Sequence, residues 1–264
     1  MRSSALRGWG IGVLVVVAWC LLSAVPASAE DAEHISSYDV VLTVGAGGAL
    51  GVTERIAYDF GTNQKHGIFR AIPTKVPFDN DNFRLYRVSD VRVTSPDGAP
   101  TDVSRSEAAG VTTLRVGDPD KTITGPHTYV LSYTVDGALN SFPDRVELYW
   151  NAIGTEWSVP IGAATVRVVA PAALTGQVCF AGVAGGVQPC TSTTVTGTKH
   201  AVDFTQAGGL SPYSAFTIAI ALPRDAVRSA VPILQERWSL KKALTPTRSP
   251  VRWPPRSCCW APAR

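Results

Sequence analysis

The stretch Glu147-Leu-Tyr-Trp-Asn-Ala-Ile-Gly-Thr-Glu-Trp-Ser-Val-Pro160 holds two tryptophans, a tyrosine, two glutamates and an asparagine within fourteen residues. Strand alternation through its first half turns Leu148 and Trp150 to one side and Glu147 and Tyr149 to the other. We therefore expect Leu148 and Trp150 to lie in a core. The aromatic residues would then join two layers of a β structure.

A functional alternative exists for the second half of this stretch. Asn151 and Gly154 break the strand pattern as turn residues do, and Trp157 follows the turn. Aromatic residues lie more often in a core than in a site. An exposed Trp157 beside Glu156 and Asn151 would instead form a surface for stacking a sugar ring or binding a peptide. The sequence leaves both interpretations open.

Apolar alternation continues on both sides of the stretch. It predicts a hairpin over residues 38–58, with its turn at Gly45-Ala-Gly-Gly48, and the clearest single strand over 128–135. Further strands are expected at 85–94, 101–104, 111–116, 164–170, 178–180, 193–196, 201–204 and 216–222. About a dozen short strands predict an all-β protein. Its architecture would be an antiparallel β-sandwich, or two smaller packed sandwiches that divide near residue 160.

The first 29 residues have the pattern of a secretory signal peptide. Arg2 and Arg7 precede an apolar run over residues 11–22, and Ala27-Ser28-Ala29 offers small residues at the cleavage positions. The run is shorter than the roughly 20 residues of a transmembrane helix. We expect a signal helix, cleavage after Ala29 and export to the cell envelope or the medium.

The last residues differ from the rest in composition. Residues 241–264 combine Pro, Arg, Cys and Trp without a strand or helix period, which predicts a disordered basic tail. The vicinal Cys258 and Cys259 in this setting suggest a changed reading frame or a truncation near Thr247. The extracytoplasmic β domain is expected to span residues 30–240.

Charge and cysteine content restrict what the domain contacts. Eight of the 24 basic residues and none of the 21 acidic residues lie outside residues 30–240, so the domain carries a net charge of −5. That balance argues against a nucleic-acid partner. Cys179 and Cys190 are the only cysteines of the domain, and export predicts a disulfide between them.

A carboxylate falls on the apolar side of the predicted hairpin. Glu54 alternates with Val52 and Ile56. Burial of a carboxylate costs free energy unless it is paired. We expect Glu54 either to pair with Arg70 or Arg55 or to lie in water at a sheet edge.

Residues 62–73 are predicted to form a structured loop. Ile68, Phe69 and Ile72 would anchor it on the core, which leaves Lys65, His66 and Arg70 polar. Arg70 could receive a ligand carboxylate or phosphate, or pair internally with Glu54. We favour the internal pair.

Several motifs of the chain form a recognisable set. They are residues 35–59, Lys65-His-Gly-Ile-Phe-Arg-Ala-Ile-Pro73, Val88-Ser-Asp-Val91, Ser95-Pro-Asp-Gly98, Glu147-Leu-Tyr-Trp-Asn151, Trp157 and Pro160-Ile161. Together they resemble a known family, the N-terminal domain of predicted bacterial membrane proteins called domain of unknown function 2207. The resemblance covers about residues 35–240. It implies a signal sequence and an extracytoplasmic β domain, followed by transmembrane helices, although no hydrophobic span follows Leu240 here. The family implies no catalytic residues.

No catalytic motif is recognisable. The sequence has no His-Glu-x-x-His metal motif, Gly-x-Ser-x-Gly elbow or phosphate-binding glycine loop, so we expect no metal and no cofactor. The prediction is a non-enzymatic interaction or sensing module that binds an envelope protein or a cell-wall polymer. Its candidate contact residues are Lys65, His66, Arg70, Asn151, Glu156 and Trp157. The alternative is a domain that binds or hydrolyses glycans, with Glu147 and Glu156 as a carboxylate pair and Trp157 as a stacking ring.

Overall fold

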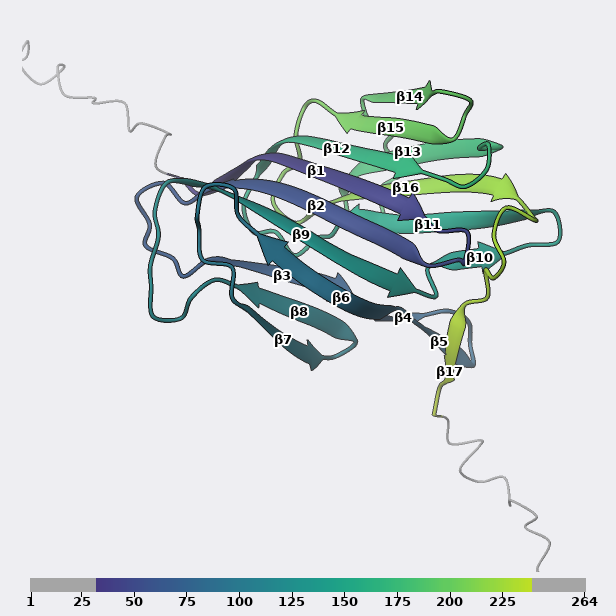
Figure 1. The fold of residues 1–264 in the computed structure, drawn as a ribbon, viewed down its shortest axis with the longest axis horizontal. Coiled ribbons are helices and arrows are strands. Elements are labelled where there is room, and N and C mark those ends of the chain that lie inside the picture. The colour runs from purple at the N-terminus through teal and green to yellow at the C-terminus, as the bar shows by residue number, and fades with distance from the viewer. Residues whose placement is uncertain (1–31, 239–264) are drawn as a thin grey trace, which may run out of the picture.

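A computed structural model describes residues 32–238, which form strands and no helix (Figure 1). The all-β prediction is therefore confirmed for this part of the chain. Among the described residues, no helix is long and apolar enough to cross a membrane. The strands are β1 (His34–Val44), β2 (Leu50–Asp59), β3 (Ile68–Pro73), β4 (Lys75–Pro77), β5 (Asn82–Leu85), β6 (Arg87–Thr94), β7 (Val103–Ala108), β8 (Val111–Val116), β9 (Pro126–Asp136), β10 (Leu139–Ser141), β11 (Arg145–Ile153), β12 (Ile161–Val169), β13 (Gly176–Val183), β14 (Ser192–Thr196), β15 (Ala201–Gln206), β16 (Ser214–Pro223) and β17 (Ile233–Glu236).

The larger layer is a seven-stranded sheet in the order β14-β15-β12-β1-β2-β9-β6. The predicted hairpin forms its centre, where Tyr38, Val40 and Leu42 on β1 are buried and alternate with more exposed residues. Neighbouring strands are antiparallel except for β1 and β12, which run parallel. The expectation of a wholly antiparallel sandwich is thus wrong at this pair. A long crossover separates β1 from β12 in the chain, as a parallel pair requires.

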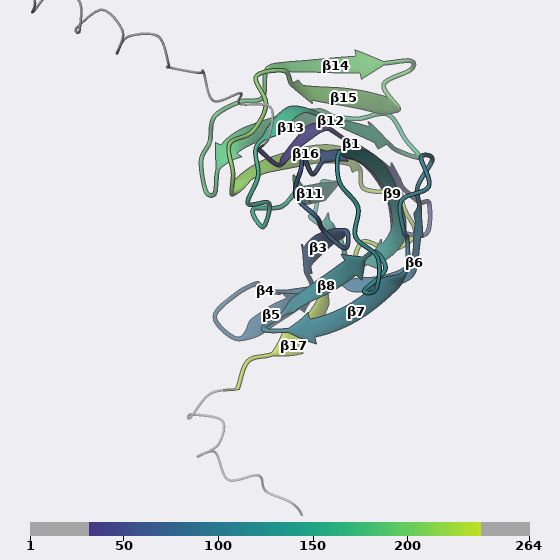
Figure 2. The same cartoon turned by 90° about the vertical axis from the view of Figure 1, so that its left-hand side faces the viewer.

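The second layer is a four-stranded sheet in the order β10-β11-β16-β13, which lies against the first (Figure 2). Leu148 and Trp150 are buried on its inner side while Tyr149 is half exposed, so the alternation predicted for β11 is confirmed. Strands from either side of residue 160 share both sheets, because β1 pairs with β12 and β11 pairs with β16. The sheets therefore do not divide at residue 160.

Two three-stranded sheets, β3-β8-β7 and β17-β5-β4, extend from the sandwich near β6 (Figure 2). Residues 68–73 form strand β3 here, so the prediction of a loop over residues 62–73 is wrong for that half. Phe69 is 63% exposed and does not anchor the segment, whereas Ile68 and Ile72 are buried as expected.

Gly67 precedes β3 and has little room for a side chain. Its φ is 139°, and Gly117 at the end of β8 has a φ of 133°. A Cβ on Gly67 would collide with the carbonyl oxygen of Val116, and one on Gly117 with that of His66. Glycine is the one residue type that allows this approach between β3 and β8.

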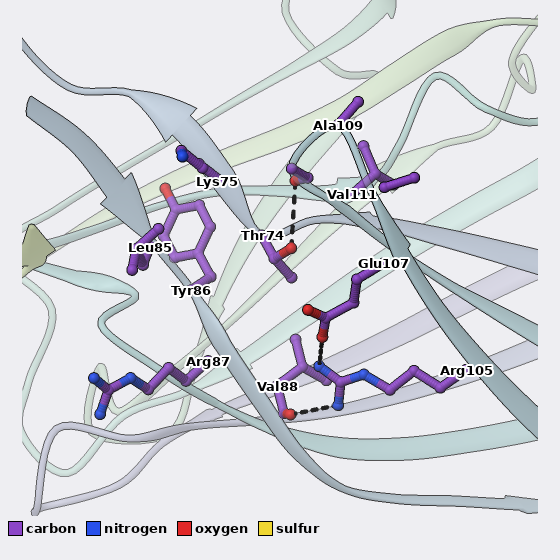
Figure 3. A pocket seen from close by; sticks show the side chains of 12 residues that line it. Thr74, Lys75, Leu85, Tyr86, Arg87, Val88, Arg105, Glu107, Ala109 and Val111 are labelled. Carbon is purple, nitrogen blue, oxygen red and sulfur yellow. Dashed lines mark hydrogen bonds and ion pairs between the residues drawn. The ribbon is translucent and has the colours of Figure 1, made fainter. Parts of the chain in front are cut away.

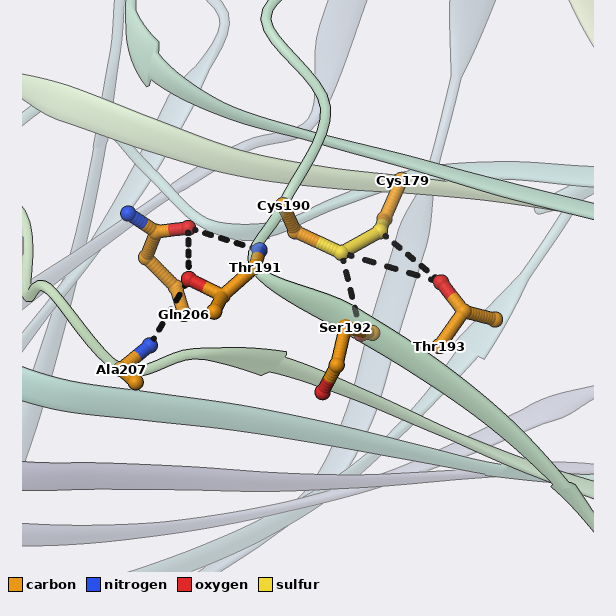
Figure 4. The surroundings of a disulfide bond; sticks show 7 residues. All are labelled: Cys179, Cys190, Thr191, Ser192, Thr193, Gln206 and Ala207. Carbon is orange, nitrogen blue, oxygen red and sulfur yellow. Dashed lines mark hydrogen bonds between the residues drawn. A yellow bond between two sulfur atoms is a disulfide. The ribbon is translucent and has the colours of Figure 1, made fainter.

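The predicted disulfide between Cys179 and Cys190 is present (Figure 4). The two Cα atoms are 5.6 Å apart. Cys179 lies on β13, and Cys190 lies two residues before β14, in the connection between the two strands. The backbone N–H of Cys190 donates to the carbonyl oxygen of Cys179, and Pro189 bridges Phe180. The disulfide therefore fixes this connection against β13. The signal peptide, its cleavage site and the basic tail with Cys258 and Cys259 lie outside the described residues.

Candidate functional site

Glu54 and Arg70 form a buried ion pair inside the sandwich. Glu54 is 0% and Arg70 2% exposed. Arg70 Nε and Nη2 each donate to one carboxylate oxygen at 2.8 Å, and the phenols of Tyr38 and Tyr133 donate to the same oxygens at 2.8 and 2.6 Å. Burial, together with the Glu54 carboxylate, raises the pKa of both phenols well above their usual value, which keeps them protonated as donors.

The favoured internal pairing of Glu54 with Arg70 is therefore confirmed, and Glu54 does not lie in water at a sheet edge. Arg70 also donates to the carbonyl oxygens of Ala71 at 2.6 Å and Ala152 at 3.4 Å. The Nε and Nη2 atoms of its guanidinium already bind Glu54. Arg70 therefore cannot use them for the bidentate contact with a ligand that the sequence left open.

Trp157 belongs to the core, so its interpretation as an exposed stacking ring is wrong. It is 7% exposed and packs edge to face on Tyr38, with ring centroids 5.6 Å apart. Tyr58 lies on another side, at 6.4 Å. The glycan alternative thereby loses its stacking platform.

Of the two carboxylates of the glycan alternative, only Glu147 lies on β11. Glu147 is near the start of the strand, while Glu156 is exposed in the turn beyond its end. The strand from Glu147 to Ile153 rises by about 20 Å at the usual spacing. The three residues after Ile153 span at most about 10 Å, so they can return over no more than about half of that rise.

Lys65 and His66 lie apart from Asn151 and support a loop. Lys65 pairs with Glu33 at 2.9 Å, and His66 Nδ1 lies 2.9 Å from the carbonyl oxygen of Lys121. Both line a hollow of about 480 Å³ together with Phe69 and other residues of this end. The structure thus brings four of the six candidate contact residues together in two pairs, Lys65 with His66 in this hollow and Arg70 with Asn151 in another pocket.

That pocket, called here the Trp150 pocket, has a volume of about 410 Å³ and lies between β11 and the segment β3–β5. Four aromatic side chains, two prolines and two arginines contribute to its walls. Tyr149 and Phe78 are 52% and 45% exposed, whereas Trp150 is 5% exposed. The lining residues are Arg70, Ile72, Pro73, Val76, Pro77, Phe78, Arg84, Tyr86, Tyr149, Trp150, Asn151 and Gly154.

Two polar atoms of this lining are buried without a hydrogen-bond partner in the described chain. They are Trp150 Nε1, a donor, and Asn151 Oδ1, an acceptor. Buried polar groups are normally paired, and an exception calls for a specific explanation. A ligand in the pocket is one such explanation, because both side chains line it.

Arg84 is a further lining residue that the sequence did not reveal. It is 5% exposed, and its guanidinium stacks 5.0 Å from the Tyr86 ring centre. Tyr86 in turn meets Trp150 edge to face, with centroids 5.3 Å apart. Burial lowers the pKa of Arg84 from its usual value. Phe83-Arg-Leu85 is an ordinary strand sequence, so no local signal marks Arg84 as buried.

A second hollow, of about 460 Å³, lies on the other side of Tyr86 (Figure 3). Arg105 donates there to Glu107 at 2.6 Å and to the carbonyl oxygen of Val88 at 2.8 Å. Arg87 extends away from this pair (Figure 3). The charged groups at its centre are paired with one another, which distinguishes this hollow from the Trp150 pocket.

Comparison with solved structures finds limited likeness. Yeast LTA4 hydrolase matches 72% of this chain with 29% of its own, at 13% identity and a TM-score of 0.47. The M1 zinc metallopeptidase from Deinococcus radiodurans matches 70% of this chain with 42% of its own, at 16% identity and a TM-score of 0.37. The chain thus covers less than half of either protein. Likeness at this level carries no argument about function.

Sequence comparison identifies the family. No curated protein sequence matches the chain. The family model described as "Predicted membrane protein (DUF2207) N-terminal domain" matches residues 34–222, more than two thirds of the chain and nearly all of the sandwich. The motifs in β3 and β11 lie within this span. The chain therefore belongs to the DUF2207 family of predicted membrane proteins.

Proposed function

We propose that this chain is an extracytoplasmic, non-enzymatic interaction or sensing domain of an envelope membrane protein, and that it binds its partner through the Trp150 pocket. The observation that carries the proposal is the pair of unpartnered polar atoms, Trp150 Nε1 and Asn151 Oδ1, on side chains that line a pocket with mostly aromatic, aliphatic and proline walls. Ligand sites typically combine apolar walls with a few placed polar groups.

The composition of the pocket supports binding rather than catalysis. None of the described residues that line it is an Asp, Glu, His, Cys, Ser or Lys. General acid–base and nucleophilic catalysis depend mainly on such side chains. Arg70 is neutralised by Glu54, so the polar groups left for a ligand serve recognition.

The disulfide and the position of β17 support the extracytoplasmic and sensing parts of the proposal. Disulfides persist in oxidising compartments outside the cytoplasm. Strand β17 pairs with β5, and Leu234 lies opposite Arg84 in that pairing. The strand by which the chain leaves the described body is thus directly beside a wall of the pocket.

Capture from isolated cell envelopes tests the proposal. The full chain is immobilised as wild type, as Tyr149→Ala and as Tyr213→Ala. Tyr213 is the matched control, because it is 62% exposed and Tyr149 is 52% exposed, yet Tyr213 is not among the residues that line the pocket. We expect a retained component that falls at least severalfold with Tyr149→Ala and is unchanged with Tyr213→Ala.

Two results would contradict the proposal. Equal retention by both variants would show that the pocket is not the contact. Release of soluble fragments from the envelopes by the wild-type chain, absent with heat-denatured protein, would show an enzyme instead of a binding module.

A further inference from the structure

Arg84 is a buried cation without a buried anion. Its Nε and Nη2 donate to the carbonyl oxygen of Gly137 at 3.0 and 2.7 Å, Nη2 also donates to Leu139 at 2.8 Å, and Nη1 donates to Asn140 Oδ1 at 2.6 Å. Each of these acceptors is neutral. No carboxylate among the described residues forms an ion pair with Arg84.

Arg70 provides an internal comparison. Both arginines line the Trp150 pocket and both are almost fully buried. Arg70 faces the Glu54 carboxylate on two nitrogens, whereas Arg84 faces only dipoles. Buried charges in proteins are usually paired, because desolvation of a lone charge is costly. The pocket therefore holds one positive charge that the described protein does not neutralise.

The donors that remain are few and specific. A guanidinium has five N–H groups, and four hydrogen bonds are made by Arg84, so one N–H on Nη1 is left. By the same count Arg70 also keeps one N–H on Nη1, and the buried indole N–H of Trp150 has no partner. The one unneutralised charge of the pocket suits a carboxylate, which carries a single negative charge. A phosphate carries nearly twice that charge, so Arg84 would neutralise it only in part.

The walls specify what accompanies the anion. Tyr149 and Phe78 present partly exposed rings at the pocket, and Pro73 and Pro77 add further apolar surface. A volume of about 410 Å³ is within the usual range for small-ligand sites. Aromatic and proline walls favour an apolar or aromatic group on the ligand.

We infer that the Trp150 pocket binds a carboxylate attached to an apolar group, with Arg84 as the electrostatic partner and the aromatic walls holding the apolar part. This chemistry occurs at the C-terminus of a peptide that ends in an apolar residue and in a free N-acylated amino acid. The inference rests on the proposed function, since it names the ligand class of the same pocket.

A peptide array distinguishes the charge from the apolar contact. The full chain is tested against immobilised hexapeptides that end in Phe, Tyr, Trp, Leu or Pro, each made as the free carboxylate and as the amide. A second arm uses free N-acetylphenylalanine and its amide. Their binding is measured from the shift of the Trp150 indole N–H signal in NMR spectra. We expect the acid of at least one pair to bind on the order of tenfold more tightly than its amide.

Two variants assign the effect to residues. Arg84→Gln should abolish the preference for acid over amide, while Tyr149→Ala should weaken both forms and leave their ratio unchanged. If circular dichroism shows that Arg84→Gln does not fold, the acid–amide ratio of affinities is compared between the wild type and Arg84→Lys instead. Arg84→Lys should retain part of the preference because it keeps the charge.

The outcomes separate the inference from the proposed function. Equal binding of acids and amides, both lost with Tyr149→Ala, overturns the carboxylate assignment and leaves the interaction module standing. A shift of the Trp150 indole signal by N-acetylphenylalanine without peptide binding supports the assignment with a free acid as the source. Absence of binding in both arms overturns the inference, whereas envelope capture with Tyr149→Ala decides the proposed function independently.

Discussion

Glu54 is a fully buried carboxylate whose two oxygens each accept from Arg70 and from one tyrosine phenol. We predict that Arg70→Met lowers the free energy of unfolding by about 3–5 kcal/mol, because it leaves Glu54 as an uncompensated buried charge. Urea unfolding followed by circular dichroism measures the change.

Lys65→Met is the matched control for that variant. Lys65 forms an ion pair with Glu33 at a similar distance, but its side chain is 47% exposed. Exposed pairs contribute about 0–1 kcal/mol. A loss from Arg70→Met no larger than that from Lys65→Met would mean that Glu54 is not an ionised partner of Arg70 in the folded protein.

At the scale of elements, Asp97 links the turn between β6 and β7 to β9. Its carboxylate accepts from the Ser95 hydroxyl at 2.8 Å and the Thr128 backbone N–H at 2.6 Å. Partial burial acts to raise the pKa of Asp97, but these hydrogen bonds outweigh it and lower the pKa to about 2. The folded pKa lies below the unfolded value, so the stabilisation is present above about pH 4 and is lost as the pH falls toward 2.

We predict that this part of the acid sensitivity disappears in Asp97→Asn. The difference in unfolding free energy between wild type and variant should shrink by about 1 kcal/mol or less between pH 5 and 2, a discounted figure because the carboxylate is 36% exposed. Urea midpoints at several pH values measure it. A difference that stays constant over this range would show that Asp97 has no depressed pKa.

The disulfide joins β13 to the connection that leads to β14. The two cysteines are separated by 11 positions in the sequence. Closing a loop of this length contributes about 2–3 kcal/mol to the free energy of unfolding. We predict that the double variant Cys179→Ala and Cys190→Ala loses that amount in guanidinium unfolding. Wild type with dithiothreitol should approach the same value. Unchanged stability upon reduction would mean that the link between β13 and β14 does not restrict the unfolded chain.

Most strands were predictable because each shows local alternation. The hairpin of β1 and β2 and strands β8, β9, β11 and β16 lie where alternation placed them. Strand β3 was missed since its buried face is Ile68, Arg70 and Ile72, and an arginine interrupts the apolar pattern. Its burial depends on Glu54, which belongs to another strand. Local periodicity does not contain such a partner.

The candidate pocket was predictable only in part for the same reason. Asn151 was identified as a turn residue that breaks the strand, and that prediction is wrong because it lies within β11, opposite Thr217. Arg84 and Tyr86 come from a segment more than 60 residues earlier in the chain. Arg84 stacks on Tyr86, and Tyr86 contacts Trp150 on β11, so both contacts depend on how the chain beyond β5 packs against a distant strand. The sequence predicted that Trp150 lies in the core, and its burial confirms this. The sequence did not predict that its indole nitrogen has no hydrogen-bond partner.

At the scale of the whole molecule, the two layers are interleaved along the chain. Strand β1 lies between β12 and β2, and β11 lies between β10 and β16. A fragment that ends at residue 160 keeps β1 and β11 but loses β12 and β16. One edge of β11, which pairs with β16, and one edge of β1, which pairs with β12, would then be open to water. We therefore predict that residues 30–160 alone do not fold, while residues 30–238 do.

Amide chemical-shift dispersion and cooperative thermal unfolding measure this difference. Addition of residues 161–238 as a second fragment should restore dispersion, because β12 can pair with β1 and β16 with β11 across the break. The disulfide lies wholly within the second fragment, so its formation does not bias the comparison. A well-dispersed, cooperatively unfolding 30–160 fragment would show that the first half carries its own core. The pocket wall formed by Trp150 and Asn151 would then not require the second half of the chain.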